Sequence, residues 1–187
     1  MQSRTVYFER PGSENTDEVL RIARQRAEEL GIRTVVVAST QGDTAVRAVK
    51  ALQGLRVVIV THSTGFREPN SQEFTEENRQ IVLSQGAVIF TATHIFAGIS
   101  RAVRNKFHTY VIGDIVANTL RVLGDGLKVA CEVAMMAADG GLVGTDEEII
   151  AIGGTGRGAD TAVVLTPVNS QNFFDLRVKE ILCKPRF

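Results

Sequence analysis

Residues 35–61 read VVVASTQGDTAVRAVKALQGLRVVIVT, and this stretch decides the fold. Residues 35–38 are an apolar run without alternation, which is typical of a strand that a parallel sheet buries on both faces. Residues 44–52 carry apolar side chains at helical spacing, and residues 57–60 form a second apolar run. Strand, helix and strand with short connections predict a right-handed parallel crossover.

The alternation continues on both sides of this unit. Before it, Asn15 and Glu18 have the spacing of a capping box at the start of an amphipathic helix over residues 15–30, which Gly31 ends. After it, we predict helices at residues 75–84, 96–105 and 115–138, and strands at 87–91, 148–152 and 161–166. The partly alternating tail at 176–183 predicts an edge strand.

The pattern at residues 115–138 could also indicate a coiled coil, because apolar positions recur alternately four and three apart. Its seam is rich in alanine and interrupted by Gly124 and Gly126, which favours a helix packed flat on a sheet. The chain is therefore predicted to be one α/β domain over residues 1–187, a three-layer αβα sandwich with a mainly parallel sheet of at least five strands. The predicted core contains Val35, Val37, Val58, Ile59, Val88, Ile89, Ile150 and Val163.

Composition excludes several classes of function. The 187 residues hold 21 basic and 21 acidic side chains, which removes the electrostatic argument for nucleic acid or an anionic membrane as the main partner. Neither a signal region nor a membrane-spanning run is present. Cys131 lies in an apolar pattern far from Cys183, so we expect reduced thiols in a cytoplasmic protein without a metal site.

Ligands of such sheets bind outside the carboxyl ends of the parallel strands. The first of these ends is residues 39–44, STQGDT, where hydroxyls, a glycine and a helix start predict a phosphate site. The alternative is a tight turn in which Asp43 or Thr44 only caps the helix. The carboxylate of Asp43 also counts against phosphate unless it faces away.

A second candidate loop is residues 153–160, GGTGRGAD, which holds four glycines around Arg157. A guanidinium group offers a bidentate fork for phosphate. A flexible hairpin with an incidental arginine is the alternative. The loop joins two strands and lacks a Gly-Lys-Ser/Thr ending, so it is neither a nucleotide P-loop nor a dinucleotide fingerprint.

Two histidines, His62 and His94, each follow a threonine just past a strand end. In one crevice they could donate to a ring carbonyl or a phosphate, or transfer a proton. Each could equally be a surface or capping residue. No third residue at a diagnostic spacing indicates a catalytic triad or a metal site, so the catalytic residues stay unknown.

At this point the chain resembles the C-terminal α/β domain of pyruvate kinase. The resemblance rests on the helix ending at Gly31, the stretch from Val35 through STQGDT, and residues 146–168, DEEIIAIGGTGRGADTAVVLTPV. It implies that the two loops hold the ends of a phosphorylated ligand. Phosphoenolpyruvate chemistry is excluded, because the catalytic barrel alone needs about 250 residues.

The chain resembles stand-alone proteins of this type, for which the resemblance implies flavin mononucleotide (FMN) as the ligand and a homo-oligomer as the assembly. A flavin would place its phosphate in the loop at residues 39–44 and its ring in the crevice, against Phe66 or Phe96. Alternatives are an FMN-dependent oxidoreductase, a sugar-phosphate-sensing regulatory module and an interaction subunit with a vestigial pocket. The candidate binding residues are Ser39, Thr40, Gln41, Gly42, Thr44, Thr61, His62, Ser63, Gly65, Phe66, Thr93, His94, Gly154, Thr155, Gly156, Arg157 and Gly158.

Overall fold

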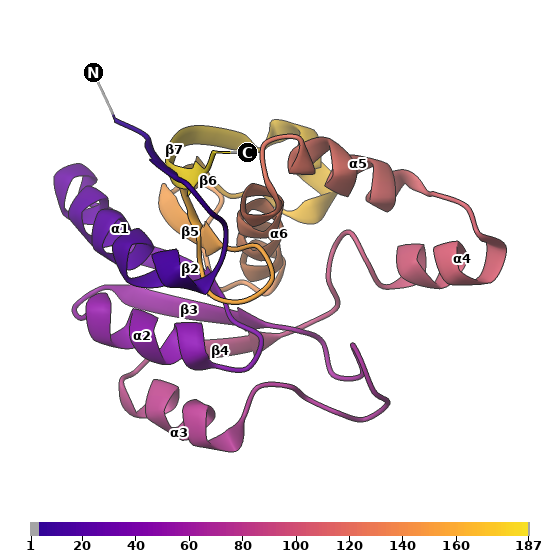
Figure 1. Ribbon diagram of the computed structural model, residues 1–187, viewed down its shortest axis with the longest axis horizontal. Coiled ribbons are helices and arrows are strands. Elements are labelled where there is room, and N and C mark those ends of the chain that lie inside the picture. Colours follow the sequence, from indigo (N-terminus) through magenta and orange to yellow (C-terminus); the bar gives the residue numbers. More distant parts are fainter. Residues whose placement is uncertain (1–3, 187) are drawn as a thin grey trace.

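The computed structural model describes residues 4–186, and within them seven strands form a single sheet in the order β1-β7-β6-β5-β2-β3-β4 (Figure 1). The strands are β1 (Val6–Phe8), β2 (Thr34–Ala38), β3 (Arg56–Thr61), β4 (Val88–Thr91), β5 (Ile149–Gly153), β6 (Thr161–Thr166) and β7 (Arg177–Pro185). β5–β6 and β6–β7 are antiparallel, and the other neighbouring pairs are parallel. The sheet is therefore mainly parallel, as predicted.

Helices cover both faces of this sheet, which gives the three layers (Figure 1). The helices are α1 (Thr16–Leu30), α2 (Asp43–Ala51), α3 (Glu76–Ser84), α4 (Ile99–Phe107), α5 (Ile112–Arg121) and α6 (Asp125–Asp139), with short 3₁₀ turns at Ser13–Asn15 and Ser170–Asp175. α1, α2 and α3 pack on one face, and α6 packs on the other. The three-layer prediction is confirmed.

Alternate residues of the central strands feed two separate cores. Val35 and Val37 pack toward α1 and α2, whereas Val36 packs toward α6. Most of the predicted core is fully buried, but Val88 and Ile89 are only half-buried because β4 is an edge strand.

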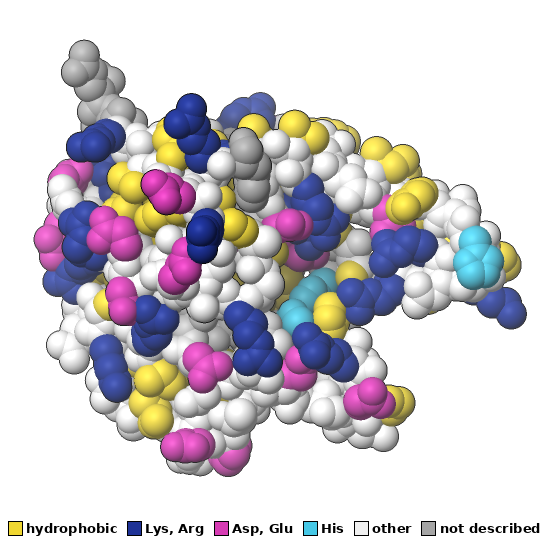
Figure 2. Space-filling model, in the orientation of Figure 1, with side chains coloured by type: hydrophobic (Ala, Val, Ile, Leu, Met, Phe, Trp, Pro, Cys, Tyr) yellow, Lys and Arg dark blue, Asp and Glu magenta, His cyan; other side chains and the backbone are white. Residues whose placement is uncertain are grey.

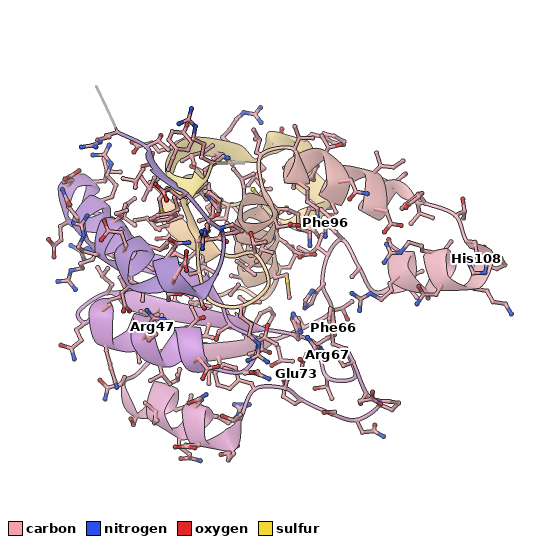
Figure 3. All side chains as sticks on the ribbon, in the orientation of Figure 1. Arg47, Phe66, Arg67, Glu73, Phe96 and His108 are labelled. Atoms are coloured by element: carbon pink, nitrogen blue, oxygen red, sulfur yellow. The ribbon has the colours of Figure 1, made fainter. Side chains whose placement is uncertain are left out.

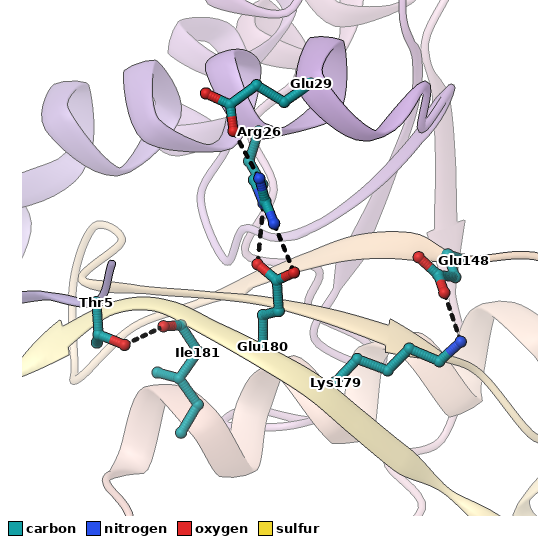
Figure 4. Close-up of polar contacts among 7 residues, drawn as sticks. All are labelled: Thr5, Arg26, Glu29, Glu148, Lys179, Glu180 and Ile181. Carbon is teal, nitrogen blue, oxygen red and sulfur yellow. Dashed lines mark hydrogen bonds and ion pairs between the residues drawn. The ribbon is translucent and has the colours of Figure 1, made fainter. Parts of the chain in front are cut away.

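An ion pair between Arg26 on α1 and Glu180 on β7 links this helix to the sheet. The Arg26 guanidinium donates to both carboxylate oxygens of Glu180 on β7, at 2.9 and 2.7 Å, and also contacts Glu29 (Figure 4). Thr5 donates its hydroxyl to the Ile181 carbonyl at 2.8 Å, which brings the first segment alongside β7. The tail is thus covered by β1 and is not the edge strand predicted from its pattern.

Two helix boundaries also differ from the sequence prediction. The helix predicted at residues 115–138 is two helices, because Gly124 has a φ of 121° between α5 and α6. The Asn15 side chain does not cap α1; its amide donates to the carbonyls of Arg10 and Gly12 instead. A 3₁₀ turn precedes α1, so the capping-box prediction is wrong.

α4 and α5 form an arm, in which α4 projects from the compact part of the molecule and α5 returns to pack on α6 (Figure 1). The first predicted helix of this region, at residues 96–105, begins and ends two or three residues later, at Ile99 and Phe107. α4 has no buried residue within the described chain, and an ion pair between the partly exposed Arg104 and the buried Asp114 joins it to α5. The arm overhangs the carboxyl ends of the parallel strands.

Candidate functional site

A cavity of about 580 Å³ lies where the carboxyl ends of β2 and β3 meet α6 and the arm. Figure 2 shows it as a hollow edged by basic side chains, with histidine and apolar atoms at its floor. This volume is within the range of small-molecule sites, roughly 300–1,000 Å³. Most of the predicted binding residues line it: Ser39, Thr40, Gln41, Thr44, Thr61, His62, Phe66, His94, Gly154, Gly156, Arg157 and Gly158.

The remaining predicted residues do not line this cavity: Gly42, Ser63, Gly65, Thr93 and Thr155. Gly65 belongs to a turn and donates its N–H to the Ser71 carbonyl at 2.9 Å. The N–H of Thr155 is used within its own loop. Gly65 and Thr155 thus make contacts within their own loops.

The loop between β2 and α2 is organised by Ser39. Its hydroxyl oxygen accepts the Ala45 N–H at 3.2 Å, so Ser39 supplies the side-chain acceptor for the first turn of α2 instead of Asp43 or Thr44. Gly42 has a φ of 107°, a backbone conformation that favours glycine. A Cβ there would lie 2.4 Å from Cβ of Asn78, so α3 fills the space that we expected a ligand to approach.

The loop at residues 153–160 is held in place by a buried carboxylate. Asp160 accepts the N–H groups of Gly12 and Thr155 at 3.1 and 3.0 Å, and the Thr161 hydroxyl at 2.8 Å. Gly158 lies against the turn before α1, since a Cβ there would meet Cα of Ser13 at 2.3 Å. The loop is an anchored β5–β6 hairpin, and Arg157 faces the cavity from it.

The two histidines meet in the cavity, as predicted. The rings of His62 and Phe66 are 4.0 Å apart between centroids, and His94 lies 5.1 Å from His62 and 5.0 Å from Phe66. Nδ1 of His62 bonds to the Glu73 carboxylate at 2.7 Å, and its Nε2 lies 3.4 Å from the Thr40 hydroxyl. The third partner that the sequence did not reveal is therefore Glu73, on the loop before α3.

The surroundings of His94 favour its neutral form. Burial lowers the pKa of His94, and the positive charges of Lys128 and Arg101 act in the same direction, while Glu132 opposes them. Its Nε2 is buried without a hydrogen-bond partner among the described residues, as is the Thr155 hydroxyl. The lowered pKa favours a neutral imidazole at His94, which lines the cavity.

The helices bring basic side chains to the cavity that the sequence patterns did not indicate. Arg101 and Arg104 come from α4, Arg121 from α5, Lys128 from α6 and Arg47 from α2. Arg104, Arg121, Lys128 and Arg47 are paired with Asp114, Asp125, Glu132 and Asp17. A Lys–Glu pair four residues apart inside an apolar helix was a readable signal, because buried charges are rarely incidental.

Two arginines of the cavity form no ion pair within the described chain, namely Arg101 and Arg157. The Arg101 guanidinium carbon lies 4.1 Å from the Phe66 ring centroid, where it makes a cation–π contact. Figure 3 shows Phe66 close to Arg67 and Glu73 on the segment after β3. Phe96 is 7% exposed and packs against Phe173, so Phe66 is the more accessible of the two predicted apolar walls.

Comparison with known proteins decides the family. The model of the pyruvate kinase alpha/beta domain matches residues 17–165. The chain belongs to this family. The matched residues run from α1 into β6 and include the loops after β2 and β5, and the fold prediction is confirmed.

Solved structures similar to this family member include two of Cryptosporidium parvum pyruvate kinase. One has 12% identity and a TM-score of 0.42 over 82% of this chain and 23% of that chain. The other, a complex with ADP, has 12% identity and a TM-score of 0.39 over 80% and 22%. An O-ureido-L-serine synthase has 18% identity and a TM-score of 0.31 over 58% and 29%. The chain thus spans less than a third of the length of each of these proteins.

Residues 4–186 contain no group of three or more His, Cys, Asp or Glu side chains arranged to hold a metal ion. No helix among them has the length and apolarity to span a bilayer. Both cysteines are buried free thiols, and burial raises the pKa of each to about 12, which keeps them protonated and chemically inert.

Proposed function

We propose that the protein binds a phosphorylated small molecule in this cavity, and that the ligand is FMN. The observation that carries the proposal is the pair of arginines, Arg101 and Arg157, that face the cavity without a carboxylate partner in the described chain. Unpaired guanidinium groups in a concave site favour an anion, and phosphate accepts their forked N–H groups well.

The start of α2 supports the same ligand. Its first backbone N–H groups have no acceptor inside the helix and lie beside the hydroxyls of Thr40 and Thr44, which line the cavity. Arg157 faces the same cavity from the β5–β6 hairpin. A phosphate between α2 and Arg157 would receive hydrogen bonds from both.

The neutral part of the cavity suits a flat, polar ring. His94 offers a buried ring nitrogen without a partner in the described chain, and the Phe66 ring provides apolar surface beside it. An isoalloxazine has carbonyl and ring N–H groups along one edge, which match a neutral imidazole. When bound, it would supply hydride-transfer chemistry.

The test is titration calorimetry with FMN and with riboflavin, which lacks the phosphate. We expect FMN to bind far more tightly, and Arg157→Gln or Thr44→Ala to weaken FMN binding by about 1–3 kcal/mol through a lost charge-assisted hydrogen bond. The matched control is Arg33→Gln, which removes an exposed arginine outside the cavity. Equal affinities for the two compounds would refute a phosphate site.

Two further measurements separate the alternatives. Absorption in the flavin bands that bleaches on anaerobic addition of NADH or NADPH would favour an oxidoreductase over a binding module. Tight binding of a sugar bisphosphate without binding of FMN would leave the phosphate site standing and reject flavin as its ligand.

A further inference from the structure

The contacts of His62 carry a second inference. Its Nδ1 bonds to Glu73 at 2.7 Å, and its Nε2 faces the Thr40 hydroxyl at 3.4 Å. A hydroxyl, an imidazole and a carboxylate in this order form the arrangement of an activated nucleophile, its general base and the group that orients the base. The hydroxyl–imidazole distance is longer than in a working site, as is common without substrate.

The side chains of Glu73 and His62 differ in how far they are exposed. The Glu73 carboxylate is 13% exposed and is shielded on its outer side by Arg67, at 3.1 Å. The His62 side chain is 25% exposed, and both it and Thr40 line the cavity. All three side chains line the cavity, with the imidazole between the carboxylate and the hydroxyl.

A structural role alone explains less of this geometry. The loop after β3 is already fixed by Gln72, whose amide donates to the His62 carbonyl at 3.0 Å, and by the Gly65–Ser71 backbone bond. Neither contact needs the His62 ring. The ring could turn to water, but it bonds to Glu73 on one side and meets Thr40 on the other.

We propose that Thr40, His62 and Glu73 form an esterase site that acts on carboxylic esters with an anionic tail. Thr40 Oγ forms a bond to the ester carbonyl carbon and passes its proton to His62 Nε2. The carbon–oxygen bond to the alcohol then breaks, and the alcohol leaves with that proton. Water attacks the acyl-threonine, gives one proton to His62 and releases the acid; His62 returns the proton to Thr40.

The tail is assigned from the position of Arg101. This guanidinium lies 4.1 Å from the Phe66 centroid, and that ring lies 4.0 Å from the ring of His62. The Phe66 ring therefore contacts both the Arg101 guanidinium and the His62 imidazole. In the first turn of α2 the Ala45 N–H bonds to Ser39, which leaves the N–H groups of Asp43 and Thr44 as donors for the oxyanion. A bound phosphate would use the same donors, so ester and phosphate would compete for them.

The first experiment treats the purified protein with diisopropyl fluorophosphate, which reports an activated hydroxyl without knowledge of the natural ester. Thr40 Oγ would bond to phosphorus, fluoride would leave, and the proton would pass to His62. Peptide mass spectrometry should find the diisopropylphosphoryl group on Thr40. A folded protein that remains unlabelled, or that is labelled elsewhere, would overturn the proposal.

Variants then test the relay. His62→Ala should slow labelling by roughly 100-fold or more, and Glu73→Gln by about tenfold or more. Added imidazole should restore part of the rate in His62→Ala, which a structural role of His62 would not allow. Thr40→Ser should retain labelling and Thr40→Val should lose it, with circular dichroism verifying that both fold.

The matched control is His108→Gln, because His108 lies at the far end of α4, away from this cavity (Figure 3). It should leave the labelling rate within about twofold. Equal labelling of Thr40 in wild type, His62→Ala and Glu73→Gln would refute the relay.

Substrate class is tested with two esters, 4-nitrophenyl acetate and the 4-nitrophenyl monoester of glutaric acid. The anionic ester should be hydrolysed at least about tenfold faster, and Arg101→Gln should remove the preference. No preference in the wild type would reject the anionic tail. Since calorimetry with FMN is independent of Thr40 labelling, this proposal and the proposed function can fail separately.

Discussion

α6 and α4 both border the cavity, but their burial is opposite. α6 buries twelve of its fifteen residues between the sheet and α5, whereas α4 buries none of its residues within the described chain. Ile99 and Phe107 on α4 are 80% and 67% exposed. The wall of the cavity that α6 forms is therefore part of the hydrophobic core. The wall that α4 forms is held by the Arg104–Asp114 pair and the Arg101–Phe66 contact. A nine-residue helix is marginal by itself in water, so we expect the second wall to open far more readily.

The largest effect on folding should come from α6. Leu127 is 1% exposed, and Leu127→Ala would leave a cavity between α6 and the sheet. We expect a loss of about 2–5 kcal/mol in the free energy of unfolding, measured by urea denaturation. Ile99→Ala is the matched control on α4 and should change it by less than about 0.5 kcal/mol. Similar losses in both variants would mean that α4 is packed as firmly as α6.

A smaller effect is expected where the arm is attached. Asp114 is 4% exposed and accepts hydrogen bonds from Arg104 and the Val111 N–H. Asp114→Ala should cost about 1–3 kcal/mol and should speed amide hydrogen exchange in α4 while leaving α6 protected. Glu28→Ala, which breaks an exposed ion pair with Arg24, is the control and should cost less than about 0.5 kcal/mol. Equal exchange in α4 of both variants would contradict this view of the arm.

The pH dependence of stability should report on His94, which lines the cavity together with residues of α4 and α6. Burial lowers the pKa of His94 from its ordinary 6.5, aided by the nearby charges of Lys128, Arg101 and protonated His62 and opposed by Glu132. Below 6.5 the unfolded chain binds more protons at His94 than the folded protein does, so stability should fall as the pH drops through the interval down to the lowered pKa. Urea unfolding from about pH 8 to about pH 5 measures this, and His94→Gln should flatten the decline. An unchanged decline in His94→Gln would assign it to other groups.

The smallest effect on folding, and the clearest on assembly, is expected from the outer face of the arm. Ile112 and Val122 on and after α5 are 79% and 81% exposed. We propose that the protein is a homo-oligomer and that these residues contribute to its contact, because large exposed apolar side chains gather on this segment: Ile99, Phe107, Tyr110, Ile112, Ile115, Val122 and Leu123. Sedimentation velocity should find an oligomer, which Ile112→Glu with Val122→Glu converts to monomer without loss of unfolding free energy. A wild-type monomer at micromolar concentration would refute this.

The sequence was sufficient for the parallel core because its strands are buried on both faces and its connections are short. Residues 35–38 and 57–60 therefore predicted β2 and β3 closely. The α5–α6 break was harder to predict, because apolar spacing continues through Gly124 and only its positive φ ends the helix. The place of the tail was misjudged because an edge strand and a strand covered by three residues of β1 have the same pattern.

The site was predictable where function lies at strand ends and unpredictable where it depends on long loops and helix faces. His62 and Arg157 lie next to strands, so the topology places them. Glu73 reaches His62 across an eleven-residue separation whose path is set by turns and by tertiary contacts. Arg101 approaches the cavity because the arm folds back, and no local pattern determines that direction.

The pairing of β1 with β7 has a consequence for folding during synthesis. Val6 is in register with Cys183, and within the described chain β1 has no other strand neighbour. A ribosome adds about 5–20 residues per second, so the first strand waits roughly 10–35 s for its partner to be made. Until then the apolar surface of α1 that β7 will cover stays open, and this nascent stage is where we expect chaperones to engage the chain.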